Sequence, residues 1–222
     1  GDSYGDFEIY SLPQDVATFS APFATNRSMP RALGTEDQPS IMQPDSCQTA
    51  AIPLFTVEEG RSAHIVFTMH EATKTYRFVV RDAEHMSLLK EVFATLSGMS
   101  GSWLPAAEQC TDTECVIPFE MSHVDGEPAV EGGVRAFGHC PNSDLHQHLL
   151  TVYAVLQNGQ QYYFVFDVTE QMHDGSHTGD GTDQPIIIET LPSPTPIEDN
   201  GGGFQPDVDE WDDIEQAIDL AA

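Results

Sequence analysis

Positive charge is the scarcest property of this 222-residue chain. It has 8 Lys+Arg against 36 Asp+Glu, a formal net charge of -28, and its lysines are Lys74 and Lys90. Proteins that bind nucleic acids or anionic lipid surfaces need clustered cations to neutralise phosphates. The composition therefore argues against both kinds of partner. High negative charge favours solubility and fits a protein displayed outside the cell or one that binds cations.

Long apolar runs and catalytic motifs are also missing. No stretch reaches the ~18 apolar residues of a membrane-spanning helix, and no charged segment followed by an apolar one opens the chain as a secretion signal would. We expect membrane association only through a lipid anchor that is absent from this chain. The sequence has neither the G-x-S-x-G pattern of a nucleophilic serine nor a G-x-x-x-x-G-K-[ST] phosphate loop. We therefore predict no enzyme activity, no catalytic residue and no cofactor.

Cysteine is scarce too, because four cysteines are few for a scaffold held by disulfides. Cys110 and Cys115 have a spacing that suits a hairpin loop. Two interpretations stay open for them, a local disulfide or two reduced thiols near a turn, because spacing alone does not supply the Cα geometry of a bridge. Cys140 ends an apolar strand and is predicted to be a small buried residue. Cys47 has no evident partner.

The chain does contain many short apolar segments with alternating side chains, a pattern typical of β-strands. Residues 88–96 are ambiguous, because their apolar positions have helical spacing. Several short strands separated by turn residues predict an all-β protein with an antiparallel β-sandwich. The predicted strands are residues 7–10, 63–70, 75–81, 114–121, 130–137, 148–157, 160–168 and 183–190.

Glycine and asparagine predict where these strands bend or turn. Gly132-Gly133 predicts a bulge within residues 130–137. Residues 97–102 predict a Gly/Ser turn before Trp103, which is expected to pack at the core or at an edge.

The pair Asn158-Gly159 predicts a hairpin with a type I′ turn, because both residues tolerate positive φ. Alternation with period two puts two sets of side chains each on one face of its strand. These are Leu150, Val152, Ala154 and Leu156 on the first strand, and Tyr162, Phe164 and Phe166 on the second.

Two groups of residues are weighed as metal ligands. His146 and His148 form H-x-H, which on a strand points both side chains the same way, but zinc needs a third and a fourth ligand and none is spaced nearby. Two partly exposed histidines are the alternative. Asp174, Asp180 and Asp183 are hard oxygen ligands in a Gly-rich loop, yet their order does not match a known calcium loop. A solvated loop is the simpler interpretation, so no metal site is predicted.

The last part of the chain is predicted to bind a partner. Residues 199–222 combine a Gly-rich hinge with an acidic tail in which Phe204, Trp211 and Ile214 are apolar. The tail suits either an amphipathic helix or an added edge strand. As a strand it would be donated to another chain or, as we favour, would fold back and cover the edge of its own sheet.

Several phrases, found in this order, resemble one family: LSGMSGSWLP (96–105), CVIPFEM (115–121), VRAFGHCP (134–141), LLTVYAVLQNGQQYYFVFDVTEQMH (149–173) and LPSPTPIEDNGGGFQPDVDEWDDIEQAIDL (191–220). The family consists of surface lipoproteins of anaerobic Gram-negative gut and oral bacteria. It carries a domain-of-unknown-function label and is related to fimbrillin-associated minor-fimbrium anchor proteins.

The resemblance implies an exported lipoprotein with two tandem transthyretin-like β-sandwiches, in which Greek-key connections link the antiparallel strands. It divides the chain into a remnant of an N-terminal domain plus a linker (1–45), a sandwich domain (46–198), and the hinge and tail (199–222). Within the first part, Arg27 and Arg31 are expected to be exposed.

The function predicted from the resemblance is non-enzymatic fimbrial assembly or anchoring, or cell adhesion, at the outer membrane or cell surface. The expected partners are fimbrial subunits or other surface proteins, and a host glycan or protein. The alternative is a surface carbohydrate-binding module that uses exposed aromatic side chains.

Overall fold

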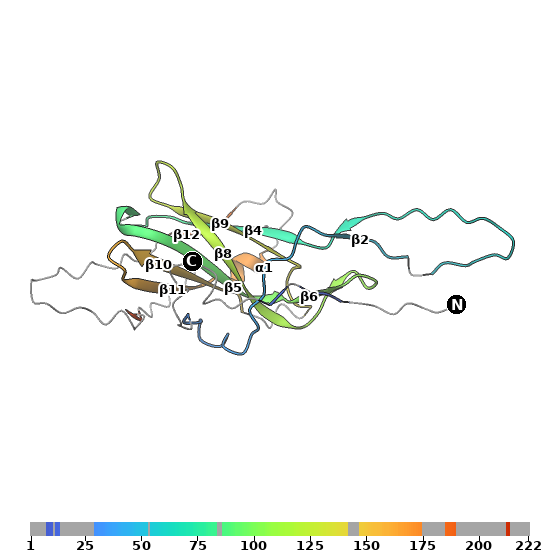
Figure 1. The fold of residues 1–222 in the computed structure, drawn as a ribbon, viewed down its shortest axis with the longest axis horizontal. Helices are drawn as coiled ribbons and strands as arrows, with labels where there is room; N and C mark the ends of the chain where they lie inside the picture. The colour runs from blue at the N-terminus through green and yellow to red at the C-terminus, as the bar shows by residue number, and fades with distance from the viewer. Residues whose placement is uncertain are drawn as a thin grey trace, which may run out of the picture.

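The computed structural model describes residues 8–10, 12–13, 29–52, 54–83, 86–141, 147–174, 185–189 and 212–213. Within these residues nearly all regular structure is strand, which confirms the predicted all-β class (Figure 1). The exceptions are a single helical turn, α1 (Thr169–His173), and the 3-10 turn η3 (Met86–Leu88). The strands are β1 (Ile9–Tyr10), β2 (Gln48–Thr49), β3 (His70–Glu71), β4 (Lys74–Val80), β5 (Leu89–Ser100), β6 (Ser102–Leu104), β7 (Gln109–Cys110), β8 (Glu114–His123), β9 (Val130–Ala136), β10 (Leu149–Leu156), β11 (Gln161–Asp167), β12 (Ile186–Ile188) and β13 (Asp212–Asp213).

The main sheet has eight strands in the order β12-β4-β9-β8-β5-β10-β11-β13. Its neighbours are antiparallel except at the two ends, where β12 pairs parallel with β4 and β13 pairs parallel with β11. Four strands of this sheet follow one another along the chain in the order β4, β5, β8, β9. Within the sheet their order is β4-β9-β8-β5, so the first of them, β4, lies beside the last, β9. This arrangement is the predicted Greek key.

Strand β8 joins two halves of this sheet, and the halves pack on each other as a β-sandwich. Its first part pairs with β5 up to Glu120, and its last three residues pair with β9. Side chains from both halves form one buried cluster, in which the rings of Phe78 on β4 and Phe119 on β8 have centroids 5.8 Å apart. Removing such side chains from water stabilises the fold by roughly 1.5–3 kcal/mol each.

The predicted hairpin is present as β10 and β11, and its faces are as expected. Leu150 pairs with Phe166, Val152 with Phe164 and Ala154 with Tyr162, and all seven side chains assigned to these two faces are buried in the core cluster.

The predicted type I′ turn of this hairpin is wrong, because Gly159 has a φ of +89° but Asn158 does not have positive φ. Leu156 N–H donates to Gln160 O (2.8 Å) and Gly159 N–H donates to Leu156 O (2.9 Å). These bonds define a three-residue loop with a type I turn followed by a left-handed glycine.

Of residues 88–96, ambiguous in the sequence, Leu88 ends η3 and the others belong to strand β5, because both neighbours of β5, β8 and β10, supply backbone partners. The turn predicted over residues 97–102 is wrong, since β5 continues to Ser100. Its glycine serves a different purpose: Gly98 has a φ of +74°, and the pairing of β5 with β8 shifts between Leu96 and Met99. The predicted turn is therefore a bulge inside a strand.

The bulge predicted at Gly132-Gly133 is also wrong, because β9 pairs with β4 and with β8 without a register shift. A Cβ on Gly132 would lie 2.8 Å from Glu120 O and 2.9 Å from Met121 Cγ, whereas one on Gly133 would meet nothing closer than 3.8 Å. Gly132 is therefore required by close packing against β8.

The strand predicted over residues 63–70 is mostly absent. Of these residues only His70 belongs to a strand, and the preceding ones lie in an extended excursion between β2 and β3 that projects away from the sandwich (Figure 1). Residues 63–69 have the alternating pattern of a strand, but no neighbouring strand in the described part of the chain pairs with them.

Part of the predicted N-terminal linker packs on the sandwich. Ile41 is buried in the core cluster, its N–H donates to Val116 O (3.0 Å), and Val116 N–H donates to Pro39 O (2.9 Å). Arg31 was expected to be exposed but is half-buried, because its guanidinium donates to the carbonyl oxygens of Thr35 and Gln38. Arg27 lies outside the described residues. The three-part division of the chain stays a prediction.

The four cysteines are separate thiols. Cys140 is buried as predicted, and burial raises its pKa to about 12. Burial also raises the pKa of Cys110. None of the helices in the described part of the chain is long and apolar enough to cross a membrane.

Candidate functional site

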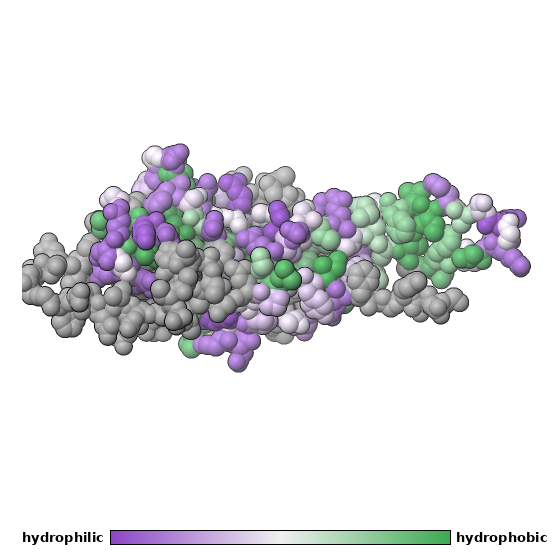
Figure 2. All heavy atoms as spheres, viewed as in Figure 1, coloured by the Kyte–Doolittle hydropathy of each residue, from purple (hydrophilic) through white to green (hydrophobic). Residues whose placement is uncertain are grey.

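The excursion between β2 and β3 is the most unusual surface of the molecule, and we call residues 50–52 and 54–69 the apolar arm. Its large apolar side chains are exposed; Leu54 is 83% accessible and Val57 78%. The space-filling view shows this apolar colour along the projection at the right of the molecule (Figure 2). The exposed set is Ile52, Leu54, Phe55, Val57, Ile65, Val66, Phe67 and Met69.

The base of the arm is fixed to the sandwich, and its tip is a tight turn. Gln48 pairs with Glu71 and Thr49 with His70, and Trp103 Nε1 donates to Thr49 Oγ1 (3.2 Å). Trp103 is thereby half-buried, in line with the predicted packing role. At the tip, Arg61 bridges Glu58 at 2.7 Å, an exposed pair that contributes little stability.

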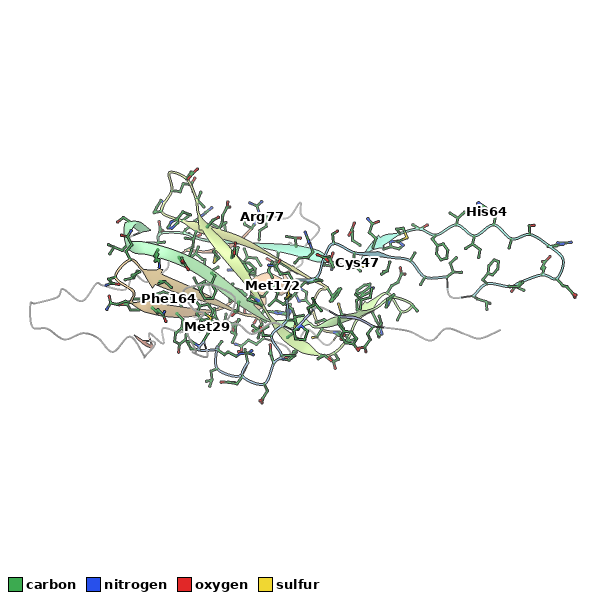
Figure 3. All side chains as sticks on the ribbon, in the orientation of Figure 1. Met29, Cys47, His64, Arg77, Phe164 and Met172 are labelled. Atoms are coloured by element: carbon green, nitrogen blue, oxygen red, sulfur yellow. The ribbon has the colours of Figure 1, made fainter. Side chains whose placement is uncertain are left out.

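Along its length the arm offers extended backbone rather than paired strands. Within residues 50–52 and 54–69, the backbone hydrogen bond present is the one from Arg61 N–H to Glu58 O (3.4 Å). Figure 3 shows His64 far out on this segment, while Phe164 and Met172 lie in the body of the sandwich. The arm thus presents extended backbone together with apolar side chains.

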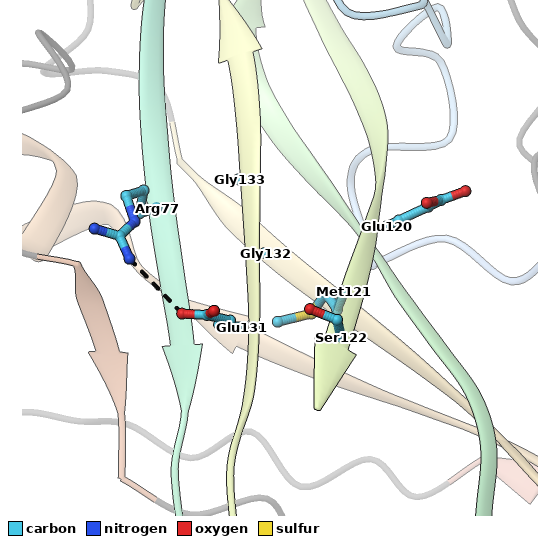
Figure 4. A pocket seen from close by; sticks show the side chains of 7 residues that line it. All are labelled: Arg77, Glu120, Met121, Ser122, Glu131, Gly132 and Gly133. Atoms are coloured by element: carbon cyan, nitrogen blue, oxygen red, sulfur yellow. Dashed lines mark ion pairs between the residues drawn. The ribbon is translucent and has the colours of Figure 1, made fainter. Parts of the chain in front are cut away.

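A small polar hollow lies on the outer surface of β4, β9 and β8, with a volume of 390 Å³ (Figure 4). Gly132 and Gly133 line it together with Arg77 and Glu131, whose charged atoms lie 3.7 Å apart. Both partners of this pair are about half exposed. The hollow has few apolar walls, so it suits a solvated polar group better than a buried ligand.

Three histidines from separate parts of the chain meet: one shortly after β9, one just before β10 and one at the end of α1. His148 Nε2 lies 3.0 Å from His139 Nδ1 and 2.9 Å from His173 Nε2. The ligand atoms of all three lie within 4.8 Å of one another. His148 is fully buried, and the other two are partly exposed. We call these residues the histidine cluster.

The local structure fixes the ring of His148. Its Nδ1 lies 3.1 Å from Ser97 O, and its backbone N–H donates to Thr169 Oγ1 (2.9 Å). The bulge in β5 makes this possible, because a Cβ on Gly98 would lie 2.8 Å from His148 Nδ1. Glycine at position 98 therefore lets the carbonyl of Ser97 reach the imidazole.

The environment keeps His139 uncharged. Burial, together with the neighbouring rings of His148 and His173, lowers the pKa of His139 to about 3. At neutral pH this imidazole is therefore neutral and keeps a lone pair available for a proton or a metal ion.

The model of one protein family matches residues 1–120, more than half of the chain, and that family is described as a domain of unknown function, DUF5119. The chain belongs to the DUF5119 family. The domain-of-unknown-function label implied by the sequence resemblance is therefore correct.

The fold of this DUF5119 protein resembles that of a solved structure from Bacteroides ovatus ATCC 8483 that is described as a candidate adhesin. The TM-score is 0.54 at 18% sequence identity, and the match covers 77% of this chain and 64% of the adhesin chain. The DUF5119 chain thus spans less than two thirds of that structure. No curated protein matches it significantly.

Most of the predicted site residues of the DUF5119 chain fall outside the described structure, namely His146, Asp180, Asp183, Phe204, Trp211 and Ile214. Asp174 is described and lies exposed directly after α1. In the tail, Asp212–Asp213 forms β13 and runs along β11 of its own chain. This placement agrees with a tail that folds back on its own sheet; a role of the tail in binding partners stays a prediction.

Sequence reasoning found one member of the histidine cluster and missed two. His148 was singled out, but with His146 as its companion and with a partly exposed side chain, whereas it is fully buried. Its companions His139 and His173 are 9 and 25 residues away in the chain. No short motif links such positions, and only the pairing of the strands and the position of α1 bring them together.

Proposed function

We propose that this chain is a non-enzymatic cell-surface protein that serves in fimbrial assembly or anchoring, or in cell adhesion, through contacts with other proteins. The observation that carries the proposal is the apolar arm. Soluble proteins rarely leave a contiguous apolar surface uncovered unless a partner covers it. Here the uncovered surface stands away from the body on a base tied to β6 through Trp103 and Thr49.

The chemistry of the arm favours a protein partner. Extended backbone with alternating apolar side chains adds readily to the exposed edge of another sheet, where backbone hydrogen bonds give affinity and side-chain pockets give specificity. The arm alternates in this way over residues 64–69, and both faces of that segment are exposed. A sheet edge of a fimbrial subunit or of another surface protein is the partner that fits.

Two further observations support a location at the cell surface. The net charge of -28 suits a protein that stays soluble in an exposed setting. The fold resembles that of a candidate adhesin. An export signal and a lipid anchor, implied by the sequence resemblance, belong to the same proposal.

Two exposed leucines provide a matched test. Leu54 lies on the apolar arm and Leu33 lies elsewhere, and they are 83% and 84% accessible. Replacing each in turn by a photo-crosslinking amino acid, in the bacterium that makes the protein, should yield adducts with a surface subunit from position 54 and not from position 33. Adducts that are the same at both positions, or a chain that fractionates with the cytoplasm, would refute the proposal.

A glycan array distinguishes the proposed protein-binding role from the alternative, a carbohydrate-binding module. We expect no glycan to bind the purified chain through the arm. A glycan whose binding is lost in Phe55→Ser and Phe67→Ser but kept in Leu33→Ser would instead assign the arm to carbohydrate recognition.

A further inference from the structure

We propose that His139, His148 and His173 bind one divalent transition-metal ion of the zinc class. The first observation is convergence. The centroid of the His148 ring lies 4.7 Å from that of His139 and 4.8 Å from that of His173. In both pairs the two ring planes are nearly perpendicular. Three imidazoles, one after β9, one just before β10 and one at the end of α1, thus bring their ring nitrogens together.

The second observation concerns where the proton of His148 sits. Ser97 O can only accept, so the nearby Nδ1 of His148 carries the proton and donates to it. The Nε2 atom of the neutral ring then has a single lone pair, which faces nitrogens of both other histidines. One lone pair cannot accept two well-aligned hydrogen bonds, whereas one cation can bind a lone pair from each of the three rings.

This arrangement is also the one that zinc-binding histidines use. A ligating histidine commonly donates its second ring N–H to a backbone carbonyl or a carboxylate, which fixes its tautomer and orientation. Ser97 O does this for His148, and the bulge at Gly98 brings it there.

The distances suit a metal of this size. Zinc binds imidazole nitrogen at about 2.0–2.1 Å, so two ligands of a tetrahedral site lie about 3.3 Å apart. His139 Nδ1 and His173 Nε2 lie 3.0 and 2.9 Å from His148 Nε2. These two pairs need to separate by a few tenths of an ångström, and the ligand atoms of His139 and His173, which lie within 4.8 Å of each other, need to reach the same spacing.

The ligand set selects the kind of metal. Three imidazole ligands favour zinc and its neighbours in the transition series, whereas calcium and magnesium require oxygen ligands. Three protein ligands leave one tetrahedral position for water. His139 and His173 are partly exposed, so solvent can reach the cluster from their side.

The position of the cluster gives the metal a structural consequence. His139 follows β9 in one half of the sandwich, His148 precedes β10 in the other, and His173 ends α1. A bound ion would tie these three elements together and stabilise the folded state, because binding to the folded state alone shifts unfolding by mass action.

The test is metal binding by the purified chain without a polyhistidine tag, after treatment with a chelator. Titration with Zn²⁺ against a competing chelator should give one ion per chain, and Co²⁺ should give the visible absorption of a tetrahedral site. His139→Gln and His173→Gln change partly exposed residues and should each weaken Zn²⁺ binding by about 100-fold or more. His148→Gln is a less direct variant, because His148 is fully buried.

His123→Gln is the matched control, since His123 is an exposed histidine at the end of β8. It should leave the affinity, the stoichiometry and the gain in melting temperature with Zn²⁺ unchanged. A wild-type chain that takes up no Zn²⁺, or one whose binding survives both His139→Gln and His173→Gln, would overturn the proposal and leave a hydrogen-bonded cluster. These measurements use the isolated chain and do not depend on the proposed surface role.

Discussion

The β10–β11 hairpin and the apolar arm begin from similar sequences and end in opposite environments. Residues 148–157 and 63–70 are both rich in β-branched and aromatic residues. In the hairpin, Leu150, Val152 and Phe164 are buried almost completely, whereas Val66 on the arm is 71% accessible. The pattern predicts an extended backbone in both places. Burial depends on whether neighbouring strands are there to cover the side chains, and β5 lies beside β10 while the arm stands alone.

The largest expected difference between the two regions comes from removing one ring from each. Phe164→Ala leaves a cavity in the core and should lower the free energy of unfolding by about 3–5 kcal/mol. Phe67→Ala on the arm should change it by less than about 0.5 kcal/mol, because the ring is 55% accessible. Chemical denaturation of the two variants measures the contrast. Equal losses would mean that the arm is packed in solution.

Two neighbouring glycines on β9 test how closely the strands of the sandwich pack. Gly132→Ala places a methyl group within 3 Å of Glu120 O and Met121 Cγ and should cost about 1–3 kcal/mol. Gly133→Ala, one residue further on the same strand, meets nothing closer than 3.8 Å and should be neutral or slightly stabilising. Thermal unfolding of both variants tests this, and a neutral Gly132→Ala would contradict the close packing of β9 on β8.

Acid should lower the stability of the β-sandwich because His139 has to take up a proton. Its pKa falls from an ordinary 6.5 to about 3 on folding, because burial and the two other histidines disfavour its charge. Between these values the unfolded chain binds the extra proton, so stability is full above about pH 6.5 and decreases as the pH falls towards 3. In the presence of a chelator, His139→Gln should reduce this slope. A profile between pH 4 and 6.5 that His139→Gln leaves unchanged would contradict the burial of the ring.

Asp167 must be considered in the same experiment. Burial alone would raise the pKa of its carboxyl, but hydrogen bonds from Thr169 and Gln147 outweigh burial and lower it. Its contribution is therefore present above its ordinary pKa of 3.8 and is lost only at lower pH. Measurements above pH 4 separate the two groups.

The smallest effect on stability is expected at Leu54, the exposed leucine of the apolar arm. Leu54→Ser should change the free energy of unfolding by less than about 0.5 kcal/mol, so the melting temperature should stay nearly unchanged. It should nevertheless lower the binding of a hydrophobic fluorescent dye, because it removes part of an exposed apolar surface. Leu33→Ser, equally exposed but off the arm, should lower dye binding less. Equal dye binding by both variants would show that the arm is not a distinct apolar surface.

Local pattern was enough for much of the fold because strands depend on period-two alternation and turn residues. The positions of β4, β8, β10 and β11 follow from it. It failed at glycines, because a glycine near a strand can have different structural roles. Gly98 lies in a bulge, Gly132 allows close packing and Gly159 follows a type I turn. Which of these a glycine serves depends on neighbouring strands that the local sequence does not specify.

By itself, the sequence of this DUF5119 protein determined the all-β class, the faces of the central hairpin and the acidic surface. These follow from side-chain chemistry within a few residues of each position. Tertiary structure decided which alternating segment is buried and which is left exposed as the apolar arm. It also decided that His139, His148 and His173 meet, since they come from separate elements that only long-range strand pairing and the packing of α1 bring together.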